Sequence, residues 1–304
     1  MDNFLIFVPL YNITVSEEVF NKEIFNGCRI ISSKEFFEEY SLKLQGCDTY
    51  KQLSNILLRN NYKYSDGLNN KFTIYTLVID NSNTLDHNIN KFEEFITKVR
   101  LYTNLDIKFC EMFCFLPRGI GALEKTIVNG VEPTNNKEKY FCGGLSYISK
   151  LATFKPISDN IANLEIINFS TISSNLRIPL NFFNLSYNYD DNDPFKIVLL
   201  ETCLECCLNV TKRECILYRS SIVLKDFFKD NKNIDNGYNL RCDVVHKGKI
   251  SLCPSEKVIV EKFKEDIQSI LIKLNRYYLE NPDSKKNYFE CYNKQNQKRK
   301  TKKC

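Results

Sequence analysis

The sequence predicts an α+β region over residues 1–190, followed by an all-α region over residues 194–282. In the first region, runs rich in β-branched and aromatic residues alternate with stretches of helical periodicity, a pattern typical of mixed strands and helices. Residues 188–193 are polar and acidic and cannot contribute to a core, so they mark the boundary. Beyond them, apolar residues recur at helical spacing.

The elements of the α+β region are expected from local composition and period. Strands are expected at residues 4–10, 28–33, 72–79, 107–116, 145–148 and 164–169. Helices are expected at residues 33–44 and 49–59, and around residues 92–99, where the apolar side chains follow helical spacing.

The all-α region is expected to begin at Asp193, which suits the N-cap, with Pro194 at the first helical position. The expected helices are residues 194–208, 212–228 and 238–247, with a polar turn at residues 230–237 and a break at residues 251–255 around Pro254. A long last helix follows, with apolar residues at helical spacing over 263–274 and an end near residues 281–282. Four helices joined by short connections predict an up-down bundle.

Charge and hydropathy restrict the possible partners. The most apolar run near the N-terminus, residues 4–10, is too short to cross a bilayer and follows no basic residue. We therefore expect a cytoplasmic protein without a membrane partner. From residue 284 onward there are eight basic residues and one acidic residue, so residues 283–304 form a basic tail. Such a tail fits either contact with RNA phosphates or a disordered, solubilising role.

The thirteen Cys residues raise the question of a metal site. Cys110 and Cys114 are four apart, and three more lie at positions 203, 206 and 207, but neither group has a matching second pair. Both His residues are far away in sequence, and a structural zinc site normally needs four ligands. We expect buried thiols that act as small apolar residues, and neither a metal nor a cofactor.

Arg241 and His246 form the pair in the all-α region best suited to chemistry. They are five positions apart, or about 140° around a helix, and the long Arg side chain can bring both heads to one pocket. Histidine can move a proton near neutral pH, and arginine can hold phosphate oxygens. The pair suits phosphodiester chemistry, although its spacing also fits a solvated Arg beside a His at a helix end.

Three segments around this pair follow one another in an informative order. They are Leu-Glu-Thr-Cys-Leu-Glu at residues 200–205, Tyr-Arg at residues 218–219 and Arg-Cys-Asp-Val-Val-His-Lys-Gly at residues 241–248. This order resembles the ApeA-like branch of the HEPN superfamily (higher eukaryotes and prokaryotes nucleotide-binding). That family has a Leu-Glu in its first helix, an Arg in its second and an Arg-x4–6-His motif. The resemblance covers roughly residues 194–280 and implies an HEPN-like bundle.

The resemblance implies a metal-independent endoribonuclease, a hydrolase of bacterial anti-phage defence that acts in abortive infection or as a toxin. His246 would be the general acid and base, and Arg241 would hold the phosphate while the RNA 2′-hydroxyl attacks it. Glu205 and Arg219 match characteristic polar positions of the family and are expected to support the site. Asp243, three residues before the His, is expected to orient the imidazole.

The sequence departs from the family pattern at two positions. Cys242 stands where many nuclease members have Asn, Asp or His, and Lys247 separates the His from the following Gly. The departures leave a second interpretation open: a non-catalytic HEPN module that binds RNA, a nucleotide or a protein partner. A third is a zinc-stabilised interaction protein.

The resemblance also suggests partners. RNA is the expected substrate, and a homodimer through the helical region would bring two Arg-His pairs to one cleft. The opening Phe-Val-Pro-Leu at residues 7–10 resembles the start of the β-rich partner region of ApeA-like proteins. Residues 1–190 are therefore expected to sense a phage-derived or protein trigger.

Overall fold

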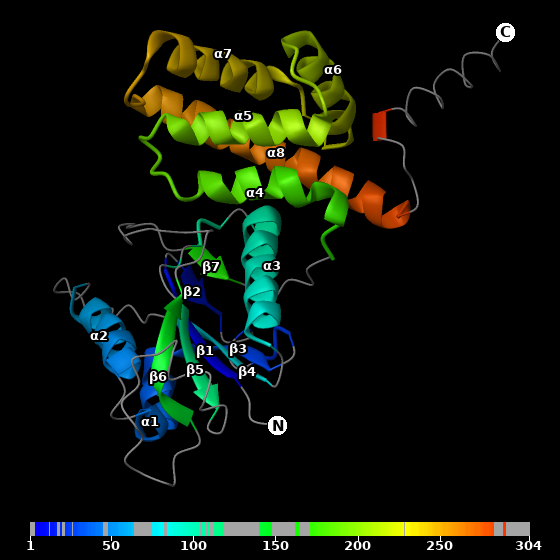
Figure 1. Ribbon diagram of the computed structural model, residues 1–304. Helices are drawn as coiled ribbons and strands as arrows, with labels where there is room; N and C mark the ends of the chain where they lie inside the picture. Colours follow the sequence, from blue (N-terminus) through cyan, green and yellow to red (C-terminus); the bar gives the residue numbers. More distant parts are fainter. Residues whose placement is uncertain are drawn as a thin grey trace. The chain divides into compact units, whose positions relative to one another are not determined.

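The computed structural model describes residues 4–11, 13–16, 19, 22–25, 27–44, 48–63, 75–81, 84–103, 105–107, 109, 112–117, 140–147, 162–164, 171–227, 229–282 and 288–289. The chain folds into two compact units (Figure 1). The first comprises Met1–Ile96 and Leu105–Asn168, and the second comprises Thr97–Asn104 and Phe169–Cys304. An α+β unit with a small antiparallel sheet and a mostly helical unit confirm the two expected fold classes.

A five-stranded antiparallel sheet, in the order β3-β4-β1-β5-β6, forms the centre of the first unit. Its strands are β1 (Phe4–Leu10), β3 (Cys28–Ser32), β4 (Tyr75–Asn81), β5 (Met112–Pro117) and β6 (Tyr140–Tyr147). A separate parallel pair joins β2 (Ile13–Val15) to β7 (Ala162–Leu164). Residues 5–8 of the central strand are all fully buried, which explains why β1 is an unbroken apolar run rather than an alternating one.

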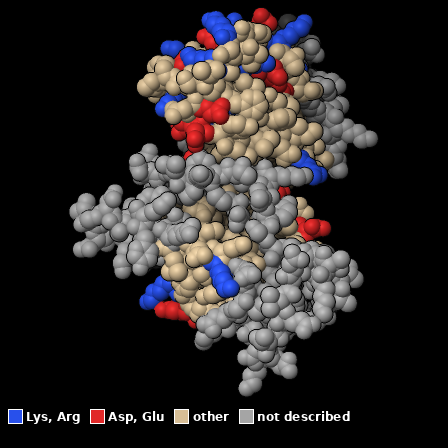
Figure 2. Space-filling view, turned by 60° about the vertical axis from the view of Figure 1, so that its left-hand side comes forward, with Lys and Arg blue, Asp and Glu red and all other residues tan. Residues whose placement is uncertain are grey.

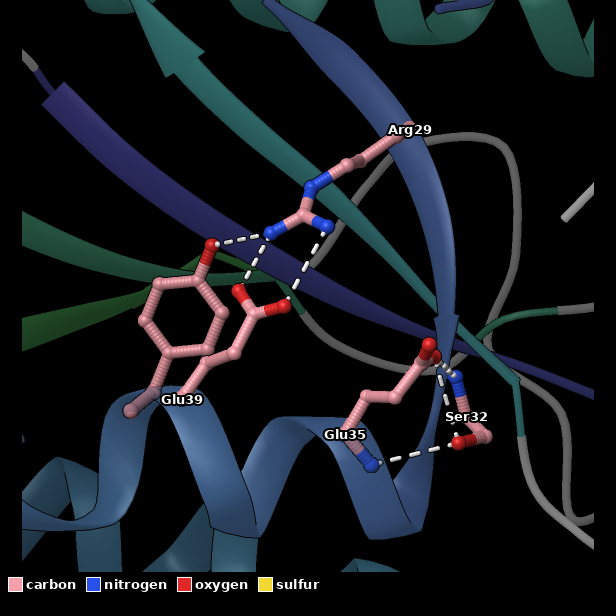
Figure 3. Close-up of polar contacts among 5 residues, drawn as sticks. Arg29, Ser32, Glu35 and Glu39 are labelled. Carbon is pink, nitrogen blue, oxygen red and sulfur yellow. Dashed lines mark hydrogen bonds and ion pairs between the residues drawn. The ribbon is translucent and has the colours of Figure 1, made fainter. Parts of the chain in front are cut away.

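The helices of the first unit are α1 (Ser33–Leu44), α2 (Asp48–Lys63) and the N-terminal part of α3 (Leu85–Thr103). A capping box starts α1: the Ser32 hydroxyl accepts a hydrogen bond from the Glu35 N–H at 3.2 Å, and the Glu35 carboxylate accepts one from the Ser32 N–H at 2.9 Å (Figure 3). Arg29 of β3 forms an ion pair with Glu39 of the same helix (Figure 3). These contacts tie α1 to the edge strand that precedes it.

The second unit contains five further α-helices within the described residues. They are α4 (Arg177–Ser186), α5 (Phe195–Leu208), α6 (Arg213–Leu224), α7 (Lys232–Lys247) and α8 (Pro254–Glu280). Their apolar side chains meet in one core, to which Leu101 at the end of α3 also belongs. Within the described ranges, none of the helices combines the length and the apolar character needed to cross a lipid bilayer.

The start of α5 lies one residue later than expected, with Pro194 and not Asp193 at the N-cap. Asp193 accepts a hydrogen bond from the Phe195 N–H at 2.8 Å, and Pro194 precedes the first helical residue. The helix ends at Asn209, whose left-handed conformation, with φ of 53°, terminates the hydrogen-bonding pattern. Residues of α5 are buried on several sides, since the helix packs against α4, α7 and α8.

The polar turn expected at residues 230–237 is wrong, because α7 begins at Lys232. The mostly polar residues 230–236 favour a turn locally, yet residues 232–236 form the start of the helix, with Ile234 buried in the core. Gly237 is buried at a close contact with α8, where an added Cβ would lie 2.4 Å from Cδ2 of Phe263. The glycine therefore marks close packing between two helices and does not end one.

The predicted domain limits, residues 1–190 and 194–282, also differ from the observed units. Residues 188–193 lie inside the helical unit, because α4 precedes them and packs against α5. The segment is held to the unit by Asn192, whose carbonyl accepts a hydrogen bond from the Leu252 N–H at 3.1 Å. The basic tail expected at residues 283–304 lies outside the described residues, except for Tyr288 and Phe289, and the Phe ring is buried in the helical core.

Candidate functional site

Helix α7 carries both residues of the predicted catalytic pair. Arg241 lies in the body of the helix, and His246 lies in its last turn, just before Gly248 in a left-handed conformation with φ of 65°. The His246 side chain is exposed, and among the described residues no hydrogen bond or ion pair engages it. The imidazole is therefore open to a ligand from solvent.

Arg241 is held by a residue of α5 that the sequence did not single out, Glu201. Nε of Arg241 lies 2.9 Å from Oε2 of Glu201, and the side chains are 26% and 1% exposed. The contact is an ion pair without good hydrogen-bond geometry: within the described residues, neither Nε nor either carboxylate oxygen has a hydrogen-bond partner, and all three atoms are buried. Charge attraction therefore anchors the inner edge of the guanidinium.

The terminal nitrogens of the same guanidinium lie in a different environment from Nε. Because Nε is buried, the exposed part of the Arg241 side chain lies elsewhere on it. The terminal nitrogens Nη1 and Nη2 are not among the buried polar atoms that lack partners, and no described residue bonds to them. They are accessible to solvent and can donate to an anion in the paired geometry that suits phosphate oxygens.

The Glu201 carboxyl has an unusual proton affinity. Its pKa is raised to about 7, chiefly by burial and then by the neighbouring Glu205 carboxylate, against the lowering effect of Arg241. Glu205 follows one helical turn later on α5, so the two carboxylates lie on the same side of that helix. Two carboxyl groups and one guanidinium group thus lie together in this part of the unit. Glu205, predicted as a supporting residue, is brought into the site through Glu201.

Asp243 and Lys247 form an ion pair with each other on α7. Oδ1 of Asp243 lies 2.7 Å from Nζ of Lys247, one helical turn away, and both side chains are largely exposed. Among the described residues, Asp243 makes no contact with the His246 imidazole, so the expected orienting role is not seen. An exposed pair of this kind contributes little to stability.

Arg219 is not brought to the site. Its Nη1 donates hydrogen bonds to the carbonyl oxygens of Leu208 and Asn209, at 2.5 and 3.3 Å, and its guanidinium lies 4.9 Å from the centre of the Phe289 ring. Carbonyls at a helix C-terminus lack partners inside the helix, and Arg219 satisfies two of them at the end of α5. Its role in this structure is to cap that helix.

Two of the three Cys residues of α5 are buried core residues as expected, and the third is not. Cys203 and Cys207 are buried, and burial raises the pKa of both thiols. Cys206 between them is exposed. In the described part of the chain, no group of three or more His, Cys, Asp or Glu residues is arranged to hold a metal ion. Cys110, the other member of the predicted pair with Cys114, lies outside the described residues.

The charges on one face of the helical unit are mixed. At the top of the view in Figure 2, the described Lys and Arg side chains of this unit lie among Asp and Glu side chains and form no continuous basic surface on that face. On that face, phosphate recognition would depend on particular residues more than on a general positive field.

In comparisons with protein-family models, with curated proteins and with solved structures, the chain matches none. The resemblance to the HEPN superfamily thus rests on the motif residues themselves. Of those residues, the structure places Arg241, Glu205 and His246 on the facing helices α5 and α7.

Proposed function

We propose that the helical unit is a metal-independent endoribonuclease of the HEPN type, an effector of bacterial anti-phage defence. The observation that supports it most directly is the state of Arg241, which is anchored through Nε while its terminal nitrogens face solvent. Five residues later on the same helix, His246 offers an exposed imidazole that no described residue engages by a hydrogen bond or ion pair. An anchored Arg and an available His are what phosphodiester cleavage needs.

In the proposed reaction, the RNA 2′-hydroxyl loses its proton and its oxygen bonds to the adjacent phosphorus. The bond from phosphorus to the 5′-oxygen of the next nucleotide breaks, and that oxygen takes up a proton. The products are a 2′,3′-cyclic phosphate and a 5′-hydroxyl. His246 moves the protons, and the terminal nitrogens of Arg241 stabilise the negative charge that grows on the phosphoryl oxygens. These roles require no metal ion.

The proposal includes an assembly and a trigger. Each chain supplies one Arg241-His246 pair, so a homodimer through the helical unit would place two imidazoles where one reaction needs both a base and an acid. The α+β unit, a compact unit with its own core, would respond to a phage-derived or protein trigger. Release of toxic ribonuclease activity only after infection fits abortive defence.

A second candidate function is a non-catalytic HEPN module that binds RNA, a nucleotide or a protein partner. The ion pair between Arg241 and the fully buried Glu201 carboxylate supports it, because part of the guanidinium is committed to the fold. The two functions share a phosphate site at Arg241 and differ in whether His246 transfers protons.

RNA cleavage in the presence of EDTA tests the proposal. We expect the full chain to cut RNA and leave 2′,3′-cyclic phosphate ends, and His246→Ala and Arg241→Ala to lose activity. Asn239→Ala, an exposed change on the same helix, is the matched control and should cut like the wild type. Equal activity in all variants would exclude this pair as the catalytic site, and binding without cleavage would favour the second function.

A further inference from the structure

Glu201 is an anomaly of the helical core. Both of its carboxylate oxygens are buried, and neither accepts a hydrogen bond from a described residue. Buried polar atoms nearly always have hydrogen-bond partners, because an unsatisfied group loses its interactions with water without replacement. Its compensating contacts are the ion pair with Nε of Arg241 and an interaction with the neighbouring Glu205 carboxyl. The carboxyl gains little stabilisation from its surroundings, so its main structural effect is the contact that it makes with Arg241.

The groups that act on this carboxyl are few. From its own helix, Glu205 contributes a like charge; from α7, Arg241 contributes an opposite charge, and the Tyr238 hydroxyl lies near enough to be influenced by all three. Among the described residues of the packed helices, no other charged group has a resolved effect on Glu201. With both acids ionised, this cluster carries one more negative than positive charge.

A phosphate group bound to the terminal nitrogens of Arg241 adds a further negative charge beside this cluster. The new charge competes with Glu201 for the guanidinium and repels the carboxylate in a poorly solvated place. The carboxyl, already held near its midpoint at neutral pH by burial, becomes easier to protonate. Uptake of one proton restores the charge balance without moving the helices.

We propose that Glu201 is the positioning residue of the phosphate site, and that it takes up a proton when a phosphate group binds to Arg241. This rests on one part of the proposed function, the binding of RNA phosphate by Arg241, and not on cleavage. Glu201 contacts Nε of Arg241 and so orients the terminal nitrogens toward the ligand. When the negatively charged ligand binds, the Glu201 carboxylate becomes protonated and neutral. Binding to this site is therefore strengthened as pH falls toward neutrality, and the effect levels off below about pH 7, where the carboxyl of the free protein is already protonated.

Calorimetry with a 2′-O-methyl RNA oligonucleotide, which cannot be cleaved, tests the proposal. The protein carries His246→Ala, so that the imidazole contributes no protons. Titration near pH 7 in two buffers of different ionisation enthalpy gives the number of protons bound with the RNA. We expect net uptake of a fraction of one proton, absent after Glu201→Gln. Glu201→Ala is expected to bind about tenfold more weakly, since the side chain that holds Nε and orients Arg241 before the ligand arrives is lost.

Two further variants separate positioning from general stability. Asp266→Asn removes another buried carboxylate of the same core, which pairs with Lys229 at 3.0 Å, and should lower stability but keep the proton uptake. Glu205→Gln removes the like charge, so the pH of maximal uptake should move downward. Uptake that persists after Glu201→Gln, or Arg241-dependent binding with no uptake, overturns the proposal but leaves the phosphate site standing. Absence of any Arg241-dependent binding overturns both.

Discussion

Gly237 of α7 lies directly against the ring of Phe263 in α8, so close that a Cβ at position 237 would meet three ring atoms at 2.4, 2.5 and 2.9 Å. The ring is itself fully buried, so it cannot swing into solvent to make room. This contact sets the distance between the helix that carries Arg241 and His246 and the longest helix of the unit.

Gly237→Ala is therefore expected to destabilise the helical unit. The added methyl group overpacks a filled core, which typically costs about 1–3 kcal/mol, and this exceeds the gain in helix propensity of at most about 1 kcal/mol. Urea unfolding followed by circular dichroism would measure the change. Asn239→Ala, two residues on and exposed, should stay within about 0.5 kcal/mol of the wild type. A Gly237→Ala protein as stable as this control would show that the helices separate easily.

His246→Ala and Arg241→Ala should both abolish cleavage but differ in stability. Loss of a general acid or base costs about 100-fold or more in rate, whereas an exposed imidazole without described partners contributes little to folding. Arg241→Ala instead leaves the buried Glu201 carboxylate without its counter-charge, which should cost roughly 1–3 kcal/mol after allowance for partial exposure. Thermal melts beside rate assays would separate the two effects. An equal fall in melting temperature in both variants would contradict the burial described for the Arg241–Glu201 ion pair.

The stability of the wild type should depend on Glu201 between about pH 4.3 and pH 7. The pKa of this carboxyl is about 7 in the folded protein and about 4.3 in an unfolded chain, so the folded state binds more protons in this window. Stability therefore falls as pH rises through the window. Glu201→Gln cannot ionise, and its stability relative to the wild type should improve by roughly 1–2 kcal/mol between pH 5 and pH 8.

Urea unfolding at several pH values checks this pH dependence of stability. Asn239→Ala is the control and should keep the wild-type dependence. A stability difference between Glu201→Gln and the wild type that stays constant across the range would mean that the carboxyl titrates normally. That result would also remove the electrostatic basis for proton uptake on RNA binding.

Arg219→Ala should behave as a capping variant. It removes hydrogen bonds to the last carbonyls of α5 and a contact with the Phe289 ring, so a loss of roughly 1–2 kcal/mol in unfolding free energy is expected. Cleavage per folded molecule should remain near the wild-type rate, because Arg219 does not touch the Arg241 site among the described residues. A large fall in rate with unchanged stability would restore the supporting role that the family resemblance suggests.

Local sequence patterns predicted those elements whose defining signals are local, whereas β2 and α4 were not predicted. The run at β1 and the limits of α1 are examples: one is continuously apolar, and the other follows a Ser-x-x-Glu capping box. The start of α7 was missed for the opposite reason. Asn, Asp and Gly favour turns in isolation, and tertiary contacts support the helix: Ile234 is buried in the core, and Gly237 packs closely against α8.

The site was predicted in part for similar reasons. Spacing and residue type singled out Arg241 and His246 as candidates. The sequence prediction named Glu205 as the supporting acid, but Leu-Glu occurs twice, one turn apart, so the sequence could not show that Glu201 is the acid in contact with Arg241. Burial decides it, since Glu201 is 1% exposed and contacts the Arg directly. The pairing of Asp243 with Lys247 was equally open, as an acid on a helix can meet partners three or four residues away.

The end of α3 has a consequence for how this protein can be divided or rearranged. Gln268 of α8 donates to the Arg100 carbonyl at 2.8 Å, and Asn275 donates to the Tyr102 hydroxyl at 2.9 Å. A fragment that starts at Phe169 lacks both acceptors and the Leu101 side chain from its core. The helical unit is discontinuous in the sequence, so no single cut in the chain separates it intact from the α+β unit.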